Sequence, residues 1–261
     1  MNFTDEALQK YKQDRFPRSA RYDPAWVHQN EMGPNVLWLT EALTQVMEIK
    51  AGMRVLDLGC GTAMSSIFLA REFGAQVWAT DLWISATDNL KRIRDAGLED
   101  RVFPIHAEAH ALPFAEEFFD AIVSLDSYHY FGTDVHYLES CLLKLLKPRC
   151  QIGIVSPASP ERIPAPPPTC LGKGWYWMNT VDWWRDLWSR TPGLDLEHAE
   201  LLPHGWDMWM QWHEFLEASG PRNRPGGVKE FDQLRADNAR YLGFVRMVGN
   251  RCSNQPGEPT A

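Results

Sequence analysis

This chain of 261 residues contains no long apolar run, and its first residues do not resemble a secretory signal. No run approaches the roughly 18 consecutive apolar residues that a membrane-spanning helix needs, so we expect no membrane partner. Residues 1–6 lack the basic stretch and the following apolar stretch of a secretory signal. A cytoplasmic location is therefore expected.

Cysteine pairs at metal-binding or redox spacing are missing too. The chain has five cysteines, an odd number, and no two of them are spaced C-x-x-C. We therefore predict free thiols, with neither a disulfide framework nor a zinc site. His106 and His110 are four residues apart, but a loop separates them from any common helix face, so no metal pair is predicted there.

Positive charge is scarce. The 26 Lys and Arg residues are outnumbered by 34 Asp and Glu residues, which gives a net charge of −8. Nucleic-acid binding depends on neutralising phosphates, and the sequence has no stripe of Lys and Arg that would do so. We expect no nucleic-acid partner, and the composition leaves the oligomeric state open.

Alternating strand and helix patterns are what the chain does contain. Apolar runs predict strands over 54–58, 76–80, 102–105, 119–125 and 151–155, and later over 194–202 and 241–248. Helical spacing covers 64–73 and 85–96, with a further helix expected around 135–146. This alternation implies right-handed βαβ units and a mostly parallel sheet.

A glycine-rich turn follows the first predicted strand and opens a helix. Gly59 and Gly61 let backbone approach a ligand with no Cβ in the way. Asp81 ends the second predicted strand about 20 residues further on, a place from which a carboxylate accepts hydrogen bonds from a ribose. A dinucleotide fingerprint would need a third glycine where Met64 stands. Asp57, two residues before Gly59, would repel a pyrophosphate but suits a ligand with an ammonium and a sulfonium group.

Residues 55–63 resemble motif I of class I S-adenosylmethionine-dependent methyltransferases. The stretches 106–114 and 117–123 support this, because they are similar to the Gly-Asp-Ala-x-x-Leu-Pro-Phe and Phe-Asp patterns of the small-molecule branch, which includes ubiquinone-biosynthesis and sarcosine-type enzymes. The resemblance covers roughly residues 34–156. It implies an α/β, Rossmann-like, doubly wound, seven-stranded sheet with the last strand antiparallel and a Trp/Pro-rich insertion after the fifth strand.

The resemblance also implies roles in binding S-adenosylmethionine. Asp57, Gly59 and Gly61 would line the methionine part, Asp81 would bind the ribose, and Leu82 would pack on the adenine. Three further residues are expected at the cofactor: Glu108, Ala109 and Ser124. The chain departs from the family pattern where Ala63 replaces a frequent third glycine and where Ala107-Glu108 replaces Gly-Asp, so the adenine contact of Glu108 depends on a longer side chain.

The residues after the fourth predicted strand are expected to form the acceptor site. They read Asp126-Ser127-Tyr128-His129-Tyr130 rather than the Pro-Pro-aromatic motif of many nucleic-acid amino-methyltransferases. His129 is the first candidate for the catalytic proton acceptor, because histidine titrates near neutrality, and the alternative is a wall residue. Asp126 and Tyr130 are the other catalytic candidates, and Tyr128 is expected to bind substrate.

Tryptophan is the compositional anomaly, with 12 residues. Val181, Trp184 and Trp188 share one helical face and are predicted to be core, with Thr180 as N-cap. Trp175 and Trp177 stand in a glycine-rich stretch, where the alternatives are a substrate lid and core packing. As a lid they would form an aromatic wall for a flat or cationic substrate.

These patterns predict four stretches of chain: an N-terminal helical segment over the site (1–50), the S-adenosylmethionine-binding core (51–156), a Trp-rich lid insertion with the last strands (157–250), and a disordered tail (251–261). The predicted function is transfer of a methyl group from S-adenosylmethionine to an O or N atom of a small-molecule metabolite, with S-adenosylhomocysteine as product. The alternatives are a nicotinamide-dependent oxidoreductase and a non-catalytic protein that binds S-adenosylmethionine.

Overall fold

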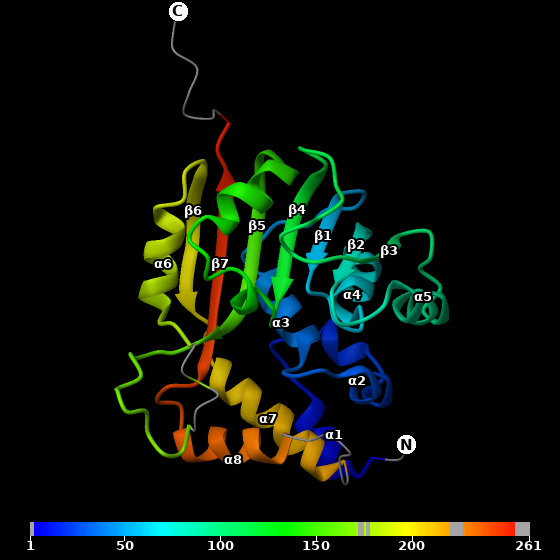
Figure 1. Ribbon diagram of the computed structural model, residues 1–261. Helices are drawn as coiled ribbons and strands as arrows, with labels where there is room; N and C mark the ends of the chain where they lie inside the picture. The colour runs from blue at the N-terminus through cyan, green and yellow to red at the C-terminus, as the bar shows by residue number, and fades with distance from the viewer. Residues whose placement is uncertain (1–2, 172–174, 176–177, 220–226, 254–261) are drawn as a thin grey trace, which may run out of the picture.

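A seven-stranded sheet with strand order β3-β2-β1-β4-β5-β7-β6 forms the centre of the molecule (Figure 1). The computed structural model describes residues 3–171, 175, 178–219 and 227–253. The first four strands are β1 (Arg54–Leu58), β2 (Gln76–Asp81), β3 (Val102–His106) and β4 (Phe119–Leu125). The others are β5 (Leu146–Ala158), β6 (Leu194–Leu201) and β7 (Gly243–Arg251).

The strand directions confirm the predicted Rossmann-like sheet. Strands β1 to β5 pair in parallel, and β7 is antiparallel to both β5 and β6. Parallel neighbours direct their carboxyl ends to one edge of the sheet, so the turns after β1, β2 and β4 meet there.

The helices between these strands lie where the sequence predicted them. Helix α4 is Met64–Phe73 and α5 is Ala86–Asp95. The helix expected around residues 135–146 is present as a π-helical turn (Leu138–Leu142) followed by a 3-10 turn (Leu143–Leu145). Strand β5 begins directly after it, at Leu146 rather than at residue 151.

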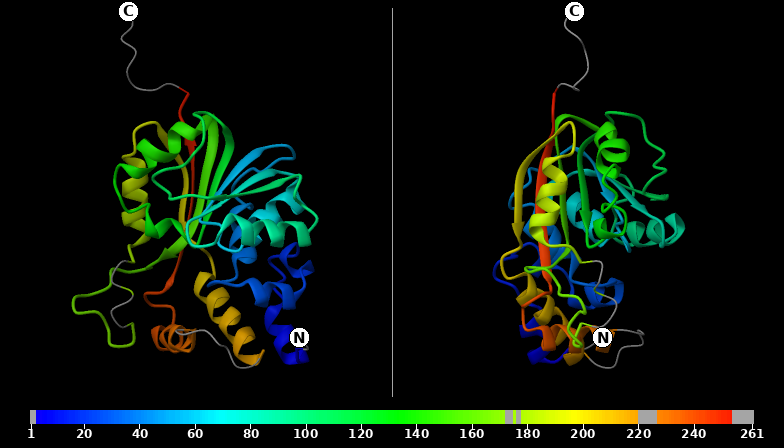
Figure 2. Two further views of the ribbon diagram at one scale, coloured as in Figure 1. Left: turned by 45° about the vertical axis from the view of Figure 1, so that its right-hand side comes forward. Right: turned by 60° about the vertical axis from the view of Figure 1, so that its left-hand side comes forward.

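The core predicted for the Trp-rich helix is present. Helix α6 is Val181–Ser189, and the Thr180 hydroxyl caps it by accepting from the Trp183 backbone N–H. Trp184 and Trp188 are buried under β6 and the 3-10 turn η2 (Tyr128–Tyr130), in ring contact with Tyr128. Helix α6 packs on one face of the sheet with Leu56 and Ile152, whereas α4 and α5 pack on the other face with Val55 and Val77. Figure 2 shows the sheet and its helices from two further sides.

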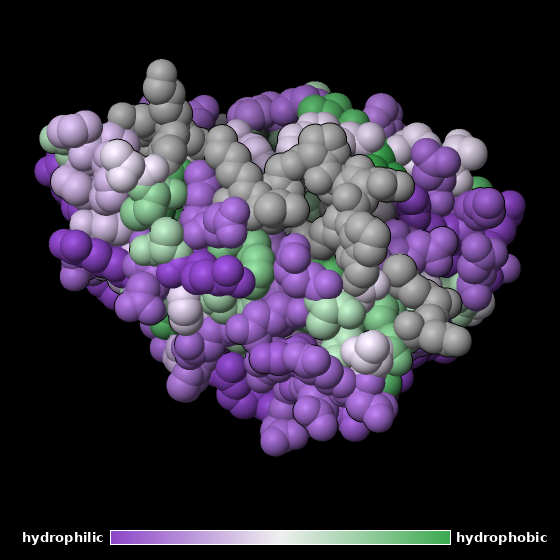
Figure 3. Space-filling model, turned by 90° about the horizontal axis from the view of Figure 1, so that it is seen from below, coloured by the Kyte–Doolittle hydropathy of each residue, from purple (hydrophilic) through white to green (hydrophobic). Residues whose placement is uncertain are grey.

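Helices from the N-terminal residues 5–43 and from the later residues 205–237 gather at the carboxyl edge of the parallel strands, the lower end in Figure 1. They are α1 (Asp5–Tyr11), η1 (Ser19–Arg21), α2 (Pro24–Asn30), α3 (Val36–Leu43), α7 (Gly205–Ala218) and α8 (Gly227–Asp237). Lys10 of α1 lies 2.7 Å from Glu214 of α7, and the Tyr11 and Phe215 rings are 5.3 Å apart. Seen from below, this end is mostly hydrophilic, with apolar residues in small patches (Figure 3).

Trp177, predicted to be either part of a substrate lid or core, lies outside the described residues, as do residues 254–261 of the tail predicted over 251–261. None of the described helices is long and apolar enough to span a membrane. All five cysteines are unpaired thiols. Within the described part of the chain, no group of three or more His, Cys, Asp and Glu side chains is arranged to hold a metal ion.

Gly153 of β5 packs closely against the last residue of α3 and the segment that follows this helix. A Cβ there would lie 2.5 Å from Met47 Sδ and 3.0 Å from Leu43 Cδ1, both of which are buried. We expect Gly153→Ala to lower the free energy of unfolding by about 1–3 kcal/mol, because overfilling a packed core forces its neighbours to move. Urea denaturation measures this.

Gly243→Ala is the matched control, since Gly243 lies in β7 and a Cβ there meets its nearest atom, Leu201 Cδ1, at an ordinary 3.4 Å. Equal losses in the two variants would show that the cost comes from the strand backbone and not from packing against α3.

Candidate functional site

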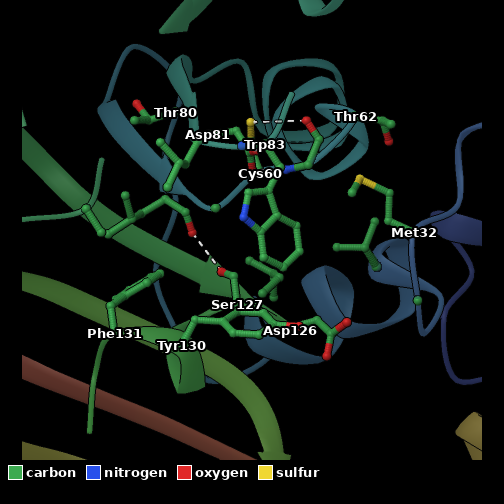
Figure 4. Close-up of a pocket in the computed structure, with 18 of the residues that line it drawn as sticks. Met32, Cys60, Thr62, Thr80, Asp81, Trp83, Asp126, Ser127, Tyr130 and Phe131 are labelled. Atoms are coloured by element: carbon green, nitrogen blue, oxygen red, sulfur yellow. Dashed lines mark hydrogen bonds between the residues drawn. The ribbon is translucent and has the colours of Figure 1, made fainter. Parts of the chain in front are cut away.

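A cavity of about 250 Å³ lies at the carboxyl edge of β1, β2 and β4 (Figure 4). Its base is the glycine loop after β1, and residues 32–34 and 36 of the N-terminal segment close one side. The predicted site residues among its walls are Gly59, Gly61, Asp81, Leu82, Glu108, Ala109, Asp126 and Tyr130. These eight are among 23 described residues that line the cavity, so the predicted residues from the turns after β1, β2 and β4 do lie at one edge of the sheet.

The glycine loop is held in a narrow space. Gly59 and Gly61 have φ of +73° and +54°, which glycine adopts without strain. A Cβ on Gly59 would clash with Ser127, and one on Gly61 would lie 2.8 Å from Met32 Sδ. Ala63, where the family often has a third glycine, also has a positive φ, 62°, so this turn is formed even with a Cβ present.

Asp81 connects the turns after β1 and β2. One carboxylate oxygen accepts from the Gly61 N–H at 2.8 Å, and the other accepts from the N–H groups of Trp83 and Ile84 at 2.7 and 2.8 Å. The side chain is only 8% exposed, yet it lines the cavity. A carboxylate has about four acceptor positions, so one remains for a ligand hydroxyl.

Asp57 lies beneath the glycine loop and not in the cavity wall. It is fully buried, and one oxygen accepts from the hydroxyls of Ser65 and Ser66, both at 2.6 Å. Burial raises the pKa of its carboxyl to about 6, nearby Asp81 adds to the rise, and the two serine hydroxyls oppose it. Its second oxygen has no hydrogen-bond partner among the described residues, so the carboxyl supports the loop at an electrostatic cost.

The residues predicted for the adenine and its surroundings differ in how they meet the cavity. Leu82 is 49% exposed at the mouth of the cavity. The Glu108 carboxylate accepts from the His110 backbone N–H and pairs with its ring Nδ1, both at 2.8 Å, and this pairing lowers its pKa. Ser124 is buried behind the wall and shares a 2.7 Å hydrogen bond with Ser127, which itself lines the cavity.

Asp126 is an ionisable side chain on the β4 side of the cavity. Its φ of 54° follows the end of β4, and its carboxyl has no hydrogen-bond partner among the described residues. Burial raises its pKa well above the ordinary value, and Glu230 adds to the rise. The carboxyl faces Gly33, where a Cβ would lie 2.8 Å from Asp126 Oδ2. Figure 4 shows it below Met32, beside Tyr130.

Three predicted substrate-side residues lie outside the described cavity wall. Tyr128 is fully buried against Trp184 and Trp188. His129 Nδ1 is 3.2 Å from Ser156 Oγ, and burial lowers the pKa of its imidazole to about 4. Trp175 donates from Nε1 to Gln233 and packs against Trp209, so its described contacts are with α7 and α8.

The sequence reasoning missed several wall residues: Met32, Pro34, Cys60, Thr62, Trp83 and Phe131. Trp83 directly follows Leu82, which was singled out, so position alone would have found it. Met32 had no such signal, because it lies outside the family-like stretch.

The middle of the chain matches a known family model. Residues 55–149 match the model described as "Methyltransferase domain". This stretch contains the glycine loop, Asp81 and the residues after β4.

Two curated relatives have sequences similar to this chain. The methyltransferase GfsG of Streptomyces halstedii is 38% identical over 90 residues, which are 34% of this chain and 32% of that protein. The 27-O-demethylrifamycin SV methyltransferase of Amycolatopsis mediterranei is 30% identical over 172 residues, 62% of this chain and 61% of that protein. The chain thus matches less than two thirds of the length of either relative.

A solved structure extends the likeness to the fold as a whole. Phosphoethanolamine N-methyltransferase 2 of Haemonchus contortus, in complex with S-adenosyl-L-methionine, superposes with a TM-score of 0.72. The match covers 96% of this chain and 61% of that one at 19% identity, so it speaks for the fold alone.

The buried Asp57 carboxyl makes stability depend on pH. Between its ordinary pKa of 3.8 and the raised value of about 6, the unfolded chain is ionised here while the folded chain keeps the proton. The free energy of unfolding therefore falls as pH rises through this window. Asp57→Asn has no proton to lose, so its stability relative to the parent should improve by about 3 kcal/mol from pH 4 to pH 7, because a tenfold change in proton affinity corresponds to about 1.4 kcal/mol.

Urea titrations at several pH values measure this difference on the ligand-free protein. Asp95→Asn, an exposed position on α5, should show a nearly constant difference from the parent. The same flat result for Asp57→Asn would contradict the raised pKa.

Proposed function

We infer that this chain, whose residues 55–149 form a class I S-adenosylmethionine-dependent methyltransferase domain, transfers a methyl group from S-adenosylmethionine to an oxygen or nitrogen atom of a small molecule. One observation carries the proposal beyond the family match. The glycine loop and the Asp81 carboxylate meet at a single cavity whose described walls include no Lys or Arg.

The charge of the cavity separates this proposal from a nicotinamide-dependent oxidoreductase. Three carboxyl groups stand in the walls, those of Asp81, Glu108 and Asp126. A pyrophosphate would meet this negative field with no described cation to neutralise it, whereas a sulfonium is favoured by it. Met64 lines the cavity at the position where a dinucleotide fingerprint has its third glycine.

The residues present fit the proposed cofactor. Gly59 and Gly61 would let the backbone approach its methionine part, Asp81 would accept from a ribose hydroxyl with its remaining acceptor position, and Leu82 and Ala109 would contact the adenine. Glu108 would act with His110, to which it is hydrogen-bonded. Asp57 and Ser124 would act from behind the wall, through the glycine loop and through Ser127.

S-adenosylmethionine held there would supply an electrophilic methyl group for transfer to a lone pair of the acceptor, the electron pair of the broken bond going to sulfur, with S-adenosylhomocysteine as product. The acceptor must also release a proton. Asp126 is the wall residue we propose to take it, because its carboxyl has no hydrogen-bond partner among the described residues, lines the cavity, and has a pKa raised by burial and by Glu230. A carboxylate with a raised pKa is a better proton acceptor near neutrality.

The proposal gives Asp126 the role of proton acceptor, for which His129 was the first candidate from the sequence. The His129 imidazole lies behind the wall against Ser156, so we propose that it positions the turn after β4. Tyr130, 61% exposed at the mouth, is proposed to contact the acceptor. Tyr128 would shape the site only through packing, and Trp175 would influence it through α8. The name of the Amycolatopsis relative describes an O-demethyl substrate, which agrees with an oxygen acceptor.

A non-catalytic protein that binds S-adenosylmethionine is the remaining candidate, because a fold does not guarantee chemistry. Formation of S-adenosylhomocysteine in the presence of a small-molecule extract, dependent on Asp126, separates it from an enzyme.

Asp81→Ala should bind S-adenosylmethionine about 10- to 100-fold more weakly, because charged hydrogen bonds contribute roughly 1.5–3 kcal/mol. Isothermal titration calorimetry measures this. Asp95→Ala, which removes an exposed carboxylate elsewhere, is the matched control and should bind normally. Unchanged affinity in Asp81→Ala would refute the ribose contact.

Asp126→Asn should lower the rate of methyl transfer by about 100-fold or more, since general-base assistance is typically worth 10²–10⁴ in rate. His129→Gln should retain the rate within about tenfold, as expected for a residue that does not take the proton. Initial rates of S-adenosylhomocysteine formation with a metabolite extract compare the two variants. The reverse order would return the role of proton acceptor to His129.

A further inference from the structure

Two exposed aromatic rings form part of the cavity mouth. Trp83, two residues after β2, is 65% exposed, and Tyr130, after β4, is 61% exposed. Their ring centroids are 5.0 Å apart at an interplanar angle of 64°, and Figure 4 shows the Trp83 indole hanging between the two sides of the cavity. Large exposed aromatic side chains that meet at a cavity commonly mark a ligand-binding surface.

The carboxyl of Asp126 stands beside this aromatic pair. It lines the same cavity and has no hydrogen-bond partner among the described residues. Burial, and the charge of Glu230 on α8, raise its pKa. Glu230 accepts from Trp209 Nε1 at 2.8 Å and pairs with His213 Nε2 at 3.1 Å, which fixes it in place. The acceptor side therefore combines π faces with a carboxyl group that an incoming cation would keep ionised.

Asp126 is separate from the carboxylate assigned to the cofactor. Asp81 is the last residue of β2 and Asp126 directly follows β4, with β1 between these strands. Neighbouring strands are about 4.8 Å apart, so the two carboxyl groups belong to opposite sides of the cavity, roughly 10 Å from one another. A cation on the acceptor would meet Asp126 without competing for the ribose contact.

We propose that the methyl acceptor carries a protonated amine or another cationic group, held between the Asp126 carboxyl and the π faces of Trp83 and Tyr130. A cation over an aromatic face and beside a carboxylate gains from both fields, and more so when partly desolvated. A carboxylate or phosphate at the same place would be repelled by Asp126 and would find no Lys or Arg in the described wall. This inference rests on the proposed function, because it assumes that the cofactor occupies the Asp81 side.

Three probes of similar shape and different charge test the proposal: 2-phenylethylamine, 2-phenylethanol and phenylacetate. Binding of S-adenosylhomocysteine is measured first, by calorimetry, and each probe is then titrated into the loaded protein. The amine should bind at least about tenfold more tightly than the alcohol, the scale of one charge-assisted hydrogen bond, and phenylacetate more weakly still.

Variants assign the preference to the named side chains. Asp126→Asn should bring the amine and the alcohol within about threefold of each other, because the neutral amide removes the charge-assisted contribution. Tyr130→Leu should weaken the amine while Tyr130→Phe, which keeps the ring, should not. All four proteins should bind S-adenosylhomocysteine equally.

The outcomes separate the two proposals. Failure to bind S-adenosylhomocysteine would count against the proposed function itself. Normal cofactor binding with equal affinities for the three probes, tighter binding of phenylacetate, no binding of 2-phenylethylamine, or an amine preference that survives Asp126→Asn would overturn the cationic acceptor alone.

Discussion

The three hydrogen bonds of the Asp81 carboxylate are the constraint on which the site depends. They join the glycine loop after β1 to the turn after β2, so two loops that follow different strands act as one wall. The loop is fixed from its other sides by Ser127 and Met32, which leave no space for a Cβ on Gly59 or Gly61. The cavity is thus lined by backbone that a few side chains hold in place.

Local patterns were sufficient to predict the sheet and which of its turns meet at the cavity. Strands β1 to β4 are short apolar runs bounded by polar turns, and in a parallel sheet their order along the chain fixes which turns meet. Gly59, Gly61 and Asp81 lie where a strand ends, so their spacing placed them in the cavity wall. Asp57 belongs to the strand itself, which is why it lies beneath the loop.

The acceptor side could not be derived in the same way. After β4 the chain enters a left-handed residue, Asp126, and then a 3-10 turn, so successive side chains point in directions that no simple period predicts. Tyr128 is turned into the core and His129 toward Ser156, whereas Asp126 and Tyr130 face the cavity. The tryptophans illustrate a similar limit: Trp206, Trp209 and Trp175 donate their indole N–H groups to residues of α8, a pairing fixed by tertiary structure.

The contacts between the N-terminal segment and α7 affect when the cavity can form during synthesis of the chain. The indole of Trp212, on α7, donates to the Gly33 carbonyl, and Lys10 pairs with Glu214. During synthesis the ribosome releases residues 1–50 and the glycine loop well before residues 205–218. Until α7 emerges, the segment around Gly33 lacks these contacts. The side of the cavity that residues 32–34 form is then not yet held in place. A nascent chain can therefore form its central strands early, while its capacity to retain a ligand should develop only once translation has passed α7.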